Sequence, residues 1–296
     1  MSTDKLKVGN YRYTKDNFDI KKAPTWVADS VPQLKEIRKT IGKNVKRIKS
    51  AQKMMYAQRK YGMLIVLQAM DAAGKDSMIS HIFAGVNPVG FQVANFKQPT
   101  SMDLRHDYLW RINKKLPPRG DIGVFNRSYY EDVLVSRVHP QIILNANLPG
   151  INSLDDVDSA FFDQRYQDIR DYEHYLARNG YKIIKLFLHV SKNEQKHRFL
   201  RRINLPEKRW KFSSSDIKER RYWDKYQKAY EKAINATATK ENPWYVIPAD
   251  DKWYSRLIVS DLLTKLIEDM PLTYPTLDPA EAARLDEAKQ ALMNEK

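Results

Sequence analysis

One segment of this 296-residue chain constrains its fold more than any other. Residues 63–84 read as a buried strand (63–68), a loop of small residues and an amphipathic helix that begins at Lys75. The backbone N–H groups of such a loop, together with the N-terminus of the next helix, bind phosphate oxygens, and the lysine adds a positive charge. The pattern therefore predicts a phosphate-binding strand–loop–helix. A tight turn whose small residues only pack closely is the alternative.

The loop departs from the usual pattern, and the departures are informative. Ala69 and Asp76 stand where glycine and serine or threonine are usual, and Asp71 places a carboxylate inside the loop. A magnesium ion between Asp71 and the phosphates would account for that charge, with Asp76 as a further candidate ligand. We expect the phosphate-binding residues to be Ala72, Ala73, Gly74, Lys75, Asp76 and Ser77.

Composition excludes several classes of protein. The absence of cysteine excludes disulfides, zinc–thiolate sites and thiol catalysis, and the six histidines form no His-x-x-x-His pair. Residues 1–13 lack the apolar segment of a signal peptide, and the longest apolar run, 63–67, is too short to span a membrane. These features predict a soluble, cytoplasmic protein without a membrane partner.

The net charge of +15 predicts a polyanionic partner, such as nucleic acid, an anionic membrane or a phosphate-rich small molecule. The charge is concentrated. Residues 35–60 carry ten Lys or Arg against one acidic residue, and residues 192–222 carry eleven against four. Two such patches indicate a defined track for an anion, and solvated helix faces are the alternative.

Strands alternate with helices along the chain, which predicts an α/β fold with a three-layer parallel sheet and helices on both faces. We expect one domain, 1–296, with an N-terminal arm and helix (1–60), a core (61–270) that includes a helical lid (192–222), and a tail (271–296). The predicted strands are 63–68, 91–96, 122–125, 181–190 and 244–247. The predicted helices are 31–59, with Ser30 as N-cap and Pro32 in its first turn, 75–84, 101–116, 155–178, 192–203, 214–236 and 252–268. Residues 1–29 read as irregular and 140–153 as a loop.

Ligands of such sheets bind beyond the carboxyl ends of the strands. Three groups of polar residues stand at strand ends: Asp71 to Lys75, Lys97, and Asn126 to Glu131. We therefore expect them to converge.

Within the third group, Arg127 could stabilise charge on a transferred phosphoryl group, which is the main catalytic need in phosphoryl transfer. Glu131, one helical turn later, could orient an acceptor or a metal-bound water. The alternatives are that Arg127 only pairs with an acidic neighbour and that Glu131 is a surface carboxylate. Asn126 holds a position where nucleotide kinases often carry a carboxylate, which weakens a direct role in metal binding.

The basic run after residue 191 is interrupted by Pro206, a pattern that fits a lid closing over phosphates and excluding water. Its candidate phosphate ligands are Arg201, Lys208, Lys211 and Arg221. An exposed pair of basic helices is the alternative.

Several motifs together resemble the polyphosphate kinase 2 family. They are residues 70–76, Gly85-Val-Asn-Pro88, Phe125-Asn-Arg-Ser-Tyr-Tyr-Glu131, residues 210–216, 223–226, 242–244 and 250–253. The resemblance covers about residues 30–270 and is specific because the motifs occur jointly.

The resemblance implies a P-loop kinase fold similar to that of thymidylate kinase. It also implies reversible phosphoryl transfer from inorganic polyphosphate to nucleotides with Mg²⁺, or Mn²⁺ as a substitute, in a homodimer or homotetramer. The motifs look like those of the subclass that accepts both AMP and ADP, with guanine nucleotides as further candidates. Asn126 and Glu131 depart from what other members carry. We expect Asn87, Asn126 and Glu131 to bind the nucleotide and Glu131 to help position AMP. The expected catalytic residues are Asp71, Lys75, Arg127 and Glu131, and Lys97 and Arg127 are further candidate phosphate ligands.

Two rival functions remain open at this point. An ATP-dependent nucleotide or nucleoside kinase would share the loop, the arginine and the lid, although two long basic patches exceed what one triphosphate requires. A nucleic-acid-binding protein would use the basic patches and the 17 tyrosines as phosphate contacts and stacking platforms. It would leave Asp71 and Lys75 unexplained, and we expect no nucleic acid partner.

Overall fold

The computed structural model of the chain describes residues 8–27 and 33–295. Within these residues, six strands form one sheet in the order β1-β6-β5-β2-β4-β3. The strands are β1 (Arg12–Tyr13), β2 (Gly62–Ala69), β3 (Phe91–Asn95), β4 (Ile122–Asn126), β5 (Tyr181–His189) and β6 (Trp244–Pro248). The five strands predicted from the sequence are all present, with ends within one or two residues.

The centre of the sheet is parallel, as predicted. Every residue of β2 is buried, and β2 lies parallel between β4 and β5. The five predicted strands all pair in parallel, and the sheet gains a further edge strand, β1, which pairs antiparallel with β6. Since β1 is only two residues long, nothing in the sequence of the N-terminal arm marks it as a strand.

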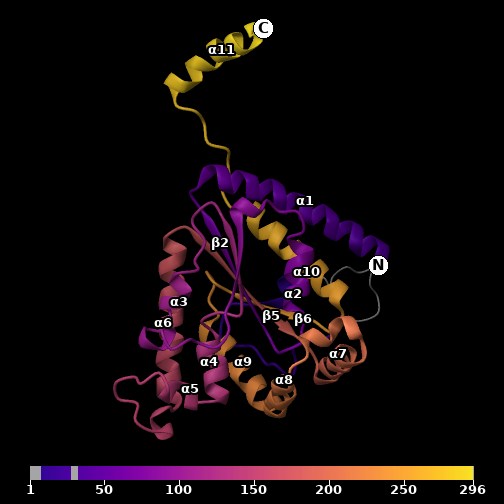
Figure 1. Cartoon of the computed structure of the whole chain (residues 1–296), viewed down its shortest axis with the longest axis vertical. Helices are drawn as coiled ribbons and strands as arrows, with labels where there is room; N and C mark the ends of the chain where they lie inside the picture. The colour runs from indigo at the N-terminus through magenta and orange to yellow at the C-terminus, as the bar shows by residue number, and fades with distance from the viewer. Residues whose placement is uncertain (1–7, 28–32, 296) are drawn as a thin grey trace.

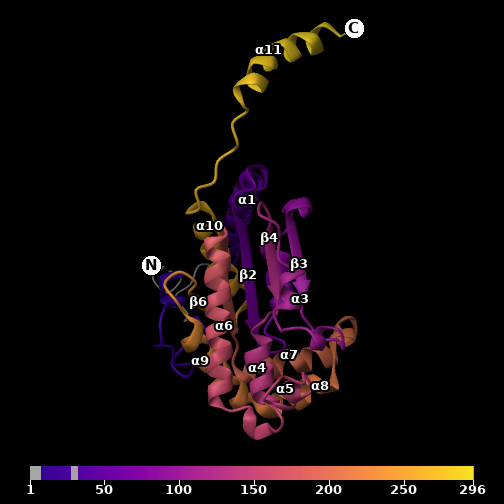
Figure 2. The same cartoon turned by 90° about the vertical axis from the view of Figure 1, so that its left-hand side faces the viewer.

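Helices cover both faces of the sheet, which confirms the three-layer prediction (Figure 1). One layer holds α1 (Leu34–Gln58), α2 (Lys75–Ile82) and α10 (Lys252–Glu268). The other holds α4 (Glu131–Val138), α6 (Ser159–Arg178) and α9 (Trp223–Thr237). Figure 2, turned by 90°, views the sheet from the side that α6 covers.

The long helix α1 buries one apolar stripe. Ile37, Ile41, Ile48 and Met55 are buried, and α1 packs against α10. The helix begins at Leu34, after Gln33, whose side chain makes no capping hydrogen bond. The predicted cap at Ser30 and the turn at Pro32 lie outside the described residues.

The helix predicted over 101–116 is wrong. The segment instead holds a 3-10 turn, Asp103–Arg105, and the single helical turn α3, Trp110–Asn113. The Asp103 carboxylate accepts hydrogen bonds from the Thr100 N–H and hydroxyl groups, and Asp107 accepts one from the Leu109 N–H. Aspartate side chains compete in this way with helical backbone bonds, and the backbone between them is extended at His106.

Three further boundaries differ from the sequence prediction. The predicted helix 214–236 is interrupted at residues 220–222, which separates α8 (Ser214–Glu219) from α9. The predicted loop 140–153 contains the short helix α5 (Gln141–Leu144), and α6 begins at Ser159, capped by the Asp158 carboxylate, rather than at residue 155.

The segment 192–222 contains α7 (Lys192–Asn204), a 3-10 turn (Pro206–Lys211) and α8, and it lies beside the carboxyl ends of the strands. The tail carries α11 (Pro279–Asn294), which projects away from the rest of the chain (Figure 2). No described helix is long and apolar enough to cross a membrane.

Candidate active site

The loop between β2 and α2 has the backbone shape of an anion-binding turn. Ala72 and Gly74 have positive φ values of 62° and 109°, so the chain coils tightly before Lys75 opens α2. The first N–H groups of a helix have no partner within the helix. At the start of α2 they are available to phosphate oxygens, as the sequence predicts for residues 72–77.

Side chains from α7 hold the loop from beneath through its carbonyl groups. Arg198 is 7% exposed and donates to the carbonyls of Ala72 (3.2 Å) and Asp250 (3.0 Å). Gln195 donates to the carbonyl of Asp71 at 3.0 Å. Sequence analysis placed Arg198 in the lid, as part of the basic run 192–222. In the structure Arg198 instead supports the phosphate loop through these hydrogen bonds.

Arg127 lies at the centre of the site. Its backbone N–H donates to the Leu67 carbonyl at the end of β2, and its φ of 63° is unusual for a residue other than glycine. The guanidinium donates to Asp71 Oδ1 (2.7 Å) and to Glu131 Oε2 (2.9 Å). The charge of Glu131, more than that of Asp71, raises the pKa of Arg127. The three residues that the sequence proposed as catalytic, Asp71, Arg127 and Glu131, therefore meet.

Lys75, the fourth proposed catalytic residue, is a buried cation whose charge is only partly balanced. Its Nζ donates to the carbonyl of Ala69 at 3.1 Å. Burial, and then the charge of Arg127, lower its pKa to about 8, although Asp71 and Glu131 partly offset this. Because the ammonium lacks full compensation, a bound phosphate would find a cation that is short of negative partners.

The far wall of this site comes from α8 and α9. A cavity of about 30 Å³ is lined by Asp71, Arg127 and Glu131, by Gln195, and by Asp216, Glu219, Arg220, Tyr226 and Tyr230. Burial, together with the charge of Asp71, raises the pKa of Asp216. Sequence analysis missed Gln195, Asp216, Glu219 and the two tyrosines. Only the acidic residues inside the basic run 192–222 gave a signal for them.

A second group of predicted residues lies on the other flank of α2. Asn126 donates to Asp76 Oδ1 (3.0 Å) and to Asn95 Oδ1 (2.7 Å), and Lys211 Nζ lies 3.5 Å from Asp76 Oδ2. Asp76 therefore contacts an amide and an ammonium rather than Asp71. The hydroxyl of Ser77 accepts a hydrogen bond from Arg256 of α10 at 2.6 Å.

Lys252 and Arg256 of α10 are further cations that sequence analysis missed. Burial, followed by the charges of Arg198, Arg201 and Lys208, lowers the pKa of Lys252 to about 8. Two of the predicted phosphate ligands, Arg201 and Lys208, thus act electrostatically on Lys252. These cations of α7, the following turn and α10 form a group in which like charges repel.

The remaining predicted residues are less well placed. Arg221 and Lys97 are exposed, and the Lys97 carbonyl accepts a hydrogen bond from Arg111. Asn87 does not join the site. Its side chain caps the turn before β3, at the amino end of that strand, whereas the phosphate loop lies at the carboxyl end of β2.

The oxygen ligands fit magnesium only in combination with a substrate. Among the described residues, no three Asp, Glu or His side chains gather into a group that could hold a metal ion. Mg²⁺ is usually held by one or two carboxylates plus substrate phosphates and water. Asp71 and Glu131, which share Arg127, are the pair that fits this requirement.

A phosphate loop at the carboxyl edge of a parallel sheet, with an arginine between two carboxylates and a helical wall of cations, defines a P-loop kinase, an enzyme of phosphoryl transfer. Residues 33–274 match the polyphosphate kinase 2 family, and the chain belongs to that family. The expectation drawn from the sequence motifs is confirmed.

Similar proteins agree with this assignment. The chain is 43% identical to an ADP-polyphosphate phosphotransferase of Rhodopseudomonas palustris over 98% of its own length and 99% of that protein. It is 45% identical to an AMP/ADP-polyphosphate phosphotransferase of Meiothermus ruber over 79% of its length and 82% of that protein. The crystal structure of polyphosphate kinase 2 from Arthrobacter aurescens superposes with a TM-score of 0.82, at 35% identity, over 94% of this chain and 95% of that one.

Proposed function

We propose that the chain transfers the terminal phosphoryl group of inorganic polyphosphate to AMP and to ADP, forming ADP and ATP, and that the reaction is reversible. The observation that carries the proposal is the meeting of Asp71, Arg127 and Glu131 above the phosphate loop. Relatives named for the use of ADP, or of AMP and ADP, support the choice of acceptors.

The proposed mechanism relies on positioning and charge. The acceptor phosphate oxygen is already a competent nucleophile, so the site needs no strong general base. Lys75 and the N–H groups at the start of α2 hold the transferred phosphoryl group, and Arg127 stabilises the charge that its oxygens carry in the transition state. Ordered donors of this kind act most strongly where water is excluded. Of the predicted lid 192–222, the part after α7 serves that purpose, since Arg198 of α7 is fixed against the phosphate loop.

Members of this family generally require a divalent metal ion, and we propose Mg²⁺, with Mn²⁺ as a substitute. Asp71 and Glu131 would hold it together with phosphate oxygens. When bound, the ion would supply positive charge that neutralises the phosphate oxygens. Asp76 contributes less, because its carboxylate is 68% exposed and lies beside Lys211 and Asn126.

The donor chain needs a longer run of cations than a nucleotide does. We propose that polyphosphate leaves the loop along Arg201, Lys208 and Lys252, whose mutual repulsion an anion would relieve. Lys211 and Arg256, which flank α2, extend this surface on either side of the loop. Arg221 and Lys97 stay candidate phosphate ligands. A homodimer or homotetramer and the use of guanine nucleotides also stay predictions.

The direct test supplies purified protein with polyphosphate, the metal ion and AMP, with ATP left out, and follows ADP and ATP by chromatography. We expect both products to accumulate. An ATP-dependent kinase of the same fold would form neither, because it has no donor. The absence of product from AMP and from ADP would overturn the proposed function.

A further inference from the structure

The helix α1 carries a row of exposed cations along its solvent side. This helix contains most of the first basic patch of the sequence, and the active site described above does not use it. Because the apolar stripe of α1 faces the core, the opposite side faces solvent, and Figure 1 shows α1 along the outside of the molecule. The exposed cations, here named the outer strip, are Lys35, Arg38, Lys39, Lys43, Lys46 and Lys53. At 1.5 Å per residue the strip is about 27 Å long.

The positive charge of the outer strip is not balanced. Among the residues that the structure describes, the cation of α1 that forms an ion pair is Arg47, with Glu268 of α10, and Arg47 lies outside the strip. Cations three or four residues apart on a helix repel one another, and the strip repeats this spacing. An anion that lies along α1 would remove the repulsion. The connection between the strip and the active site decides which anion this is.

A contact between α1 and α10 joins the strip to the phosphate loop. Arg256 of α10 donates to the hydroxyl of Ser77, in the first turn of α2, at 2.6 Å. The guanidinium groups of Arg256 and Arg38 each lie 4.5 Å from the centre of the Trp253 ring. The cations therefore continue from the phosphate loop through Arg256 to Arg38, at the amino end of the strip.

The two arginines at this junction are short of negative partners. Arg256 is 6% exposed. Burial lowers its pKa, Asp251 partly offsets this, and the charge of Arg38 lowers the pKa again. A phosphate group bound beside both guanidinium groups would supply the missing negative charge.

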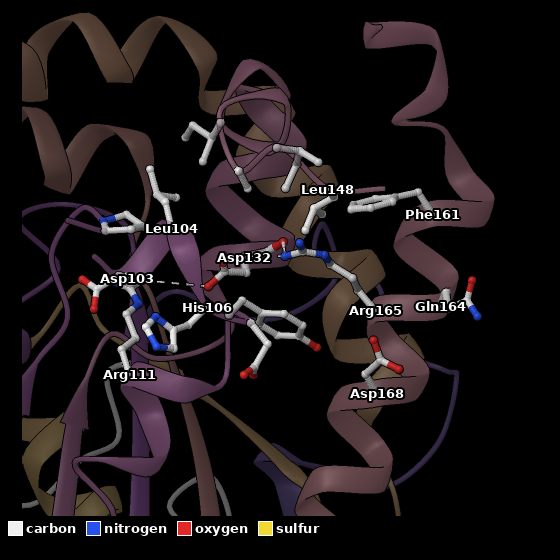
Figure 3. Close-up of a pocket in the computed structure, with 16 residues that line it drawn as sticks. Asp103, Leu104, His106, Arg111, Asp132, Leu148, Phe161, Gln164, Arg165 and Asp168 are labelled. Atoms are coloured by element: carbon white, nitrogen blue, oxygen red, sulfur yellow. Dashed lines mark hydrogen bonds and ion pairs between the residues drawn. The ribbon is translucent and has the colours of Figure 1, made fainter. Parts of the chain in front are cut away.

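The opposite side of the active site is acidic. A cavity of about 280 Å³ lies between the segment 99–111, the first turn of α4, α5 and the start of α6 (Figure 3). Its charged lining consists of four carboxylates and two guanidinium groups, those of Asp103, Asp107, Asp132, Asp168, Arg111 and Arg165. This excess of negative charge repels phosphate oxygens, so a polyanion that leaves the phosphate loop is directed toward α10 and α1.

The composition of the strip favours polyphosphate over nucleic acid. Proteins that bind single-stranded nucleic acid combine cations with aromatic side chains on which the bases stack. The residues exposed between the lysines of the strip include Gly42 and Ser50, and the strip itself consists of lysine and arginine. Polyphosphate carries charge along its whole length and has no bases, so a row of cations is sufficient to bind it.

We propose that the outer strip of α1 is a second binding surface for polyphosphate, which holds the part of a long chain that extends beyond the phosphate loop. The inference rests on the proposed function and deepens it, because it makes the enzyme favour long donor chains over short ones. A chain held at both places dissociates only when both sets of contacts break. A short chain that fills the phosphate loop does not reach α1 and gains nothing from the strip.

Reversing charges on α1 tests the inference. The variant Lys39→Glu with Lys43→Glu reverses two exposed charges one helical turn apart. Lys228→Glu with Lys232→Glu, at the same spacing on the exposed side of α9 in the other helical layer, is the matched control. In calorimetry we expect the α1 variant to bind long-chain polyphosphate at least about ten-fold more weakly and tripolyphosphate less than about two-fold more weakly. The α9 variant should bind both as wild type does.

Two results would overturn the inference. One is an equal loss of affinity for both chain lengths in the α1 variant, or no loss for the long chain. The other is single-stranded DNA that binds the wild-type protein more tightly than long-chain polyphosphate at physiological salt and loses this affinity in the α1 variant. That result would assign the strip to nucleic acid.

Turnover separates this inference from the proposed function. With AMP as acceptor, kcat/KM for long-chain polyphosphate should exceed that for tripolyphosphate, and the ratio should fall by at least about ten-fold in the α1 variant. Equal values of kcat/KM for the two donors in wild-type protein would contradict the inference alone. Binding of long chains through α1 without any product from AMP or ADP would contradict the proposed function alone.

Discussion

At the scale of single residues, the charged side chains of the site have incomplete sets of partners. Arg127 is shared between Asp71 and Glu131. Within the described residues, the Lys75 ammonium donates only to the carbonyl group of Ala69. Substrate phosphates and a metal ion would complete both sets of contacts. The two predictions at this scale follow from that incompleteness.

Glu131 should distinguish AMP from ADP. AMP lacks the β-phosphate of ADP and leaves space that a metal ion or water held by Glu131 would fill. We expect Glu131→Asn to lower kcat/KM for AMP at least ten-fold and that for ADP much less, in assays with saturating polyphosphate. Equal losses for both acceptors would show that Glu131 has no part in positioning AMP.

The pKa of Lys75 predicts how polyphosphate binding depends on pH. The pKa is lowered to about 8, so Lys75 loses its proton as the pH rises through about 8. Phosphate oxygens favour the charged form, so binding raises this pKa. We expect proton uptake on binding at pH 8.5 to 9 and a fall in affinity above pH 8.

Calorimetry in two buffers with different ionisation enthalpies measures that uptake. Lys75→Arg provides the control, because an arginine stays charged throughout this range, so this variant should take up fewer protons than wild type. The uptake that remains would come from Lys252, whose pKa is also lowered to about 8. If Lys75→Arg showed the same proton uptake as wild type, another group would be responsible.

At the scale of helices and strands, the catalytic turn after β4 is held by a buried network. Tyr129 and Tyr130, between Arg127 and Glu131, both donate to Glu173 Oε1, at 2.9 and 2.8 Å. Lys185 of β5 donates to Glu173 Oε2 at 2.7 Å, and the side chains of the pair are 0% and 1% exposed. The network thereby fixes the backbone that presents both catalytic side chains.

Breaking this buried pair should destabilise the protein strongly. Lys185→Met leaves the Glu173 carboxylate buried without its cation, and we expect a loss of about 3–5 kcal/mol in the free energy of unfolding. Urea denaturation measures the loss, and the double variant Lys185→Met with Glu173→Leu should recover much of it. A loss below about 1 kcal/mol for Lys185→Met would mean that the pair does not organise this region.

The same scale shows what the sequence could predict. The buried strands and helix α1 could be predicted, because the spacing of their apolar residues does not depend on what they pack against. The segment 101–116 also has a helical composition, yet it does not form one helix, because the Asp103 and Asp107 carboxylates accept hydrogen bonds from the backbone N–H groups of Thr100 and Leu109. The meeting of Asp71, Arg127 and Glu131 could be predicted, because the carboxyl ends of parallel strands lie at one edge of the sheet. Lys252 and Asp216 could not, since their approach depends on how α10 and α8 pack.

At the scale of the whole molecule, positive and negative side chains gather in different places. The cations around the phosphate loop belong to α2, α7, α10 and the turn after α7, whereas the large cavity beside α4 is acidic. We therefore expect the polyphosphate donor to bind along the cations around the phosphate loop.

This division predicts different salt responses for the two substrates. Polyphosphate contacts many cations, so raising NaCl from about 50 to 200 mM should weaken its binding by at least about ten-fold through counterion release. AMP, with a single phosphate, should respond far less. Binding titrations at several salt concentrations test this, and a flat response for polyphosphate would argue against an extended track of cations.

The central claim is that the site around Arg127, which lies between Asp71 and Glu131, catalyses phosphoryl transfer from polyphosphate to a nucleotide. The most direct measurement is a single-turnover reaction of ³²P-labelled polyphosphate with AMP, in the presence of Mg²⁺ and without ATP. We expect the label to appear in the β-phosphate of ADP, and Arg127→Ala to slow that step by about 10³-fold or more while polyphosphate still binds. Label released only as inorganic phosphate, or transfer at the wild-type rate in Arg127→Ala, would contradict the account.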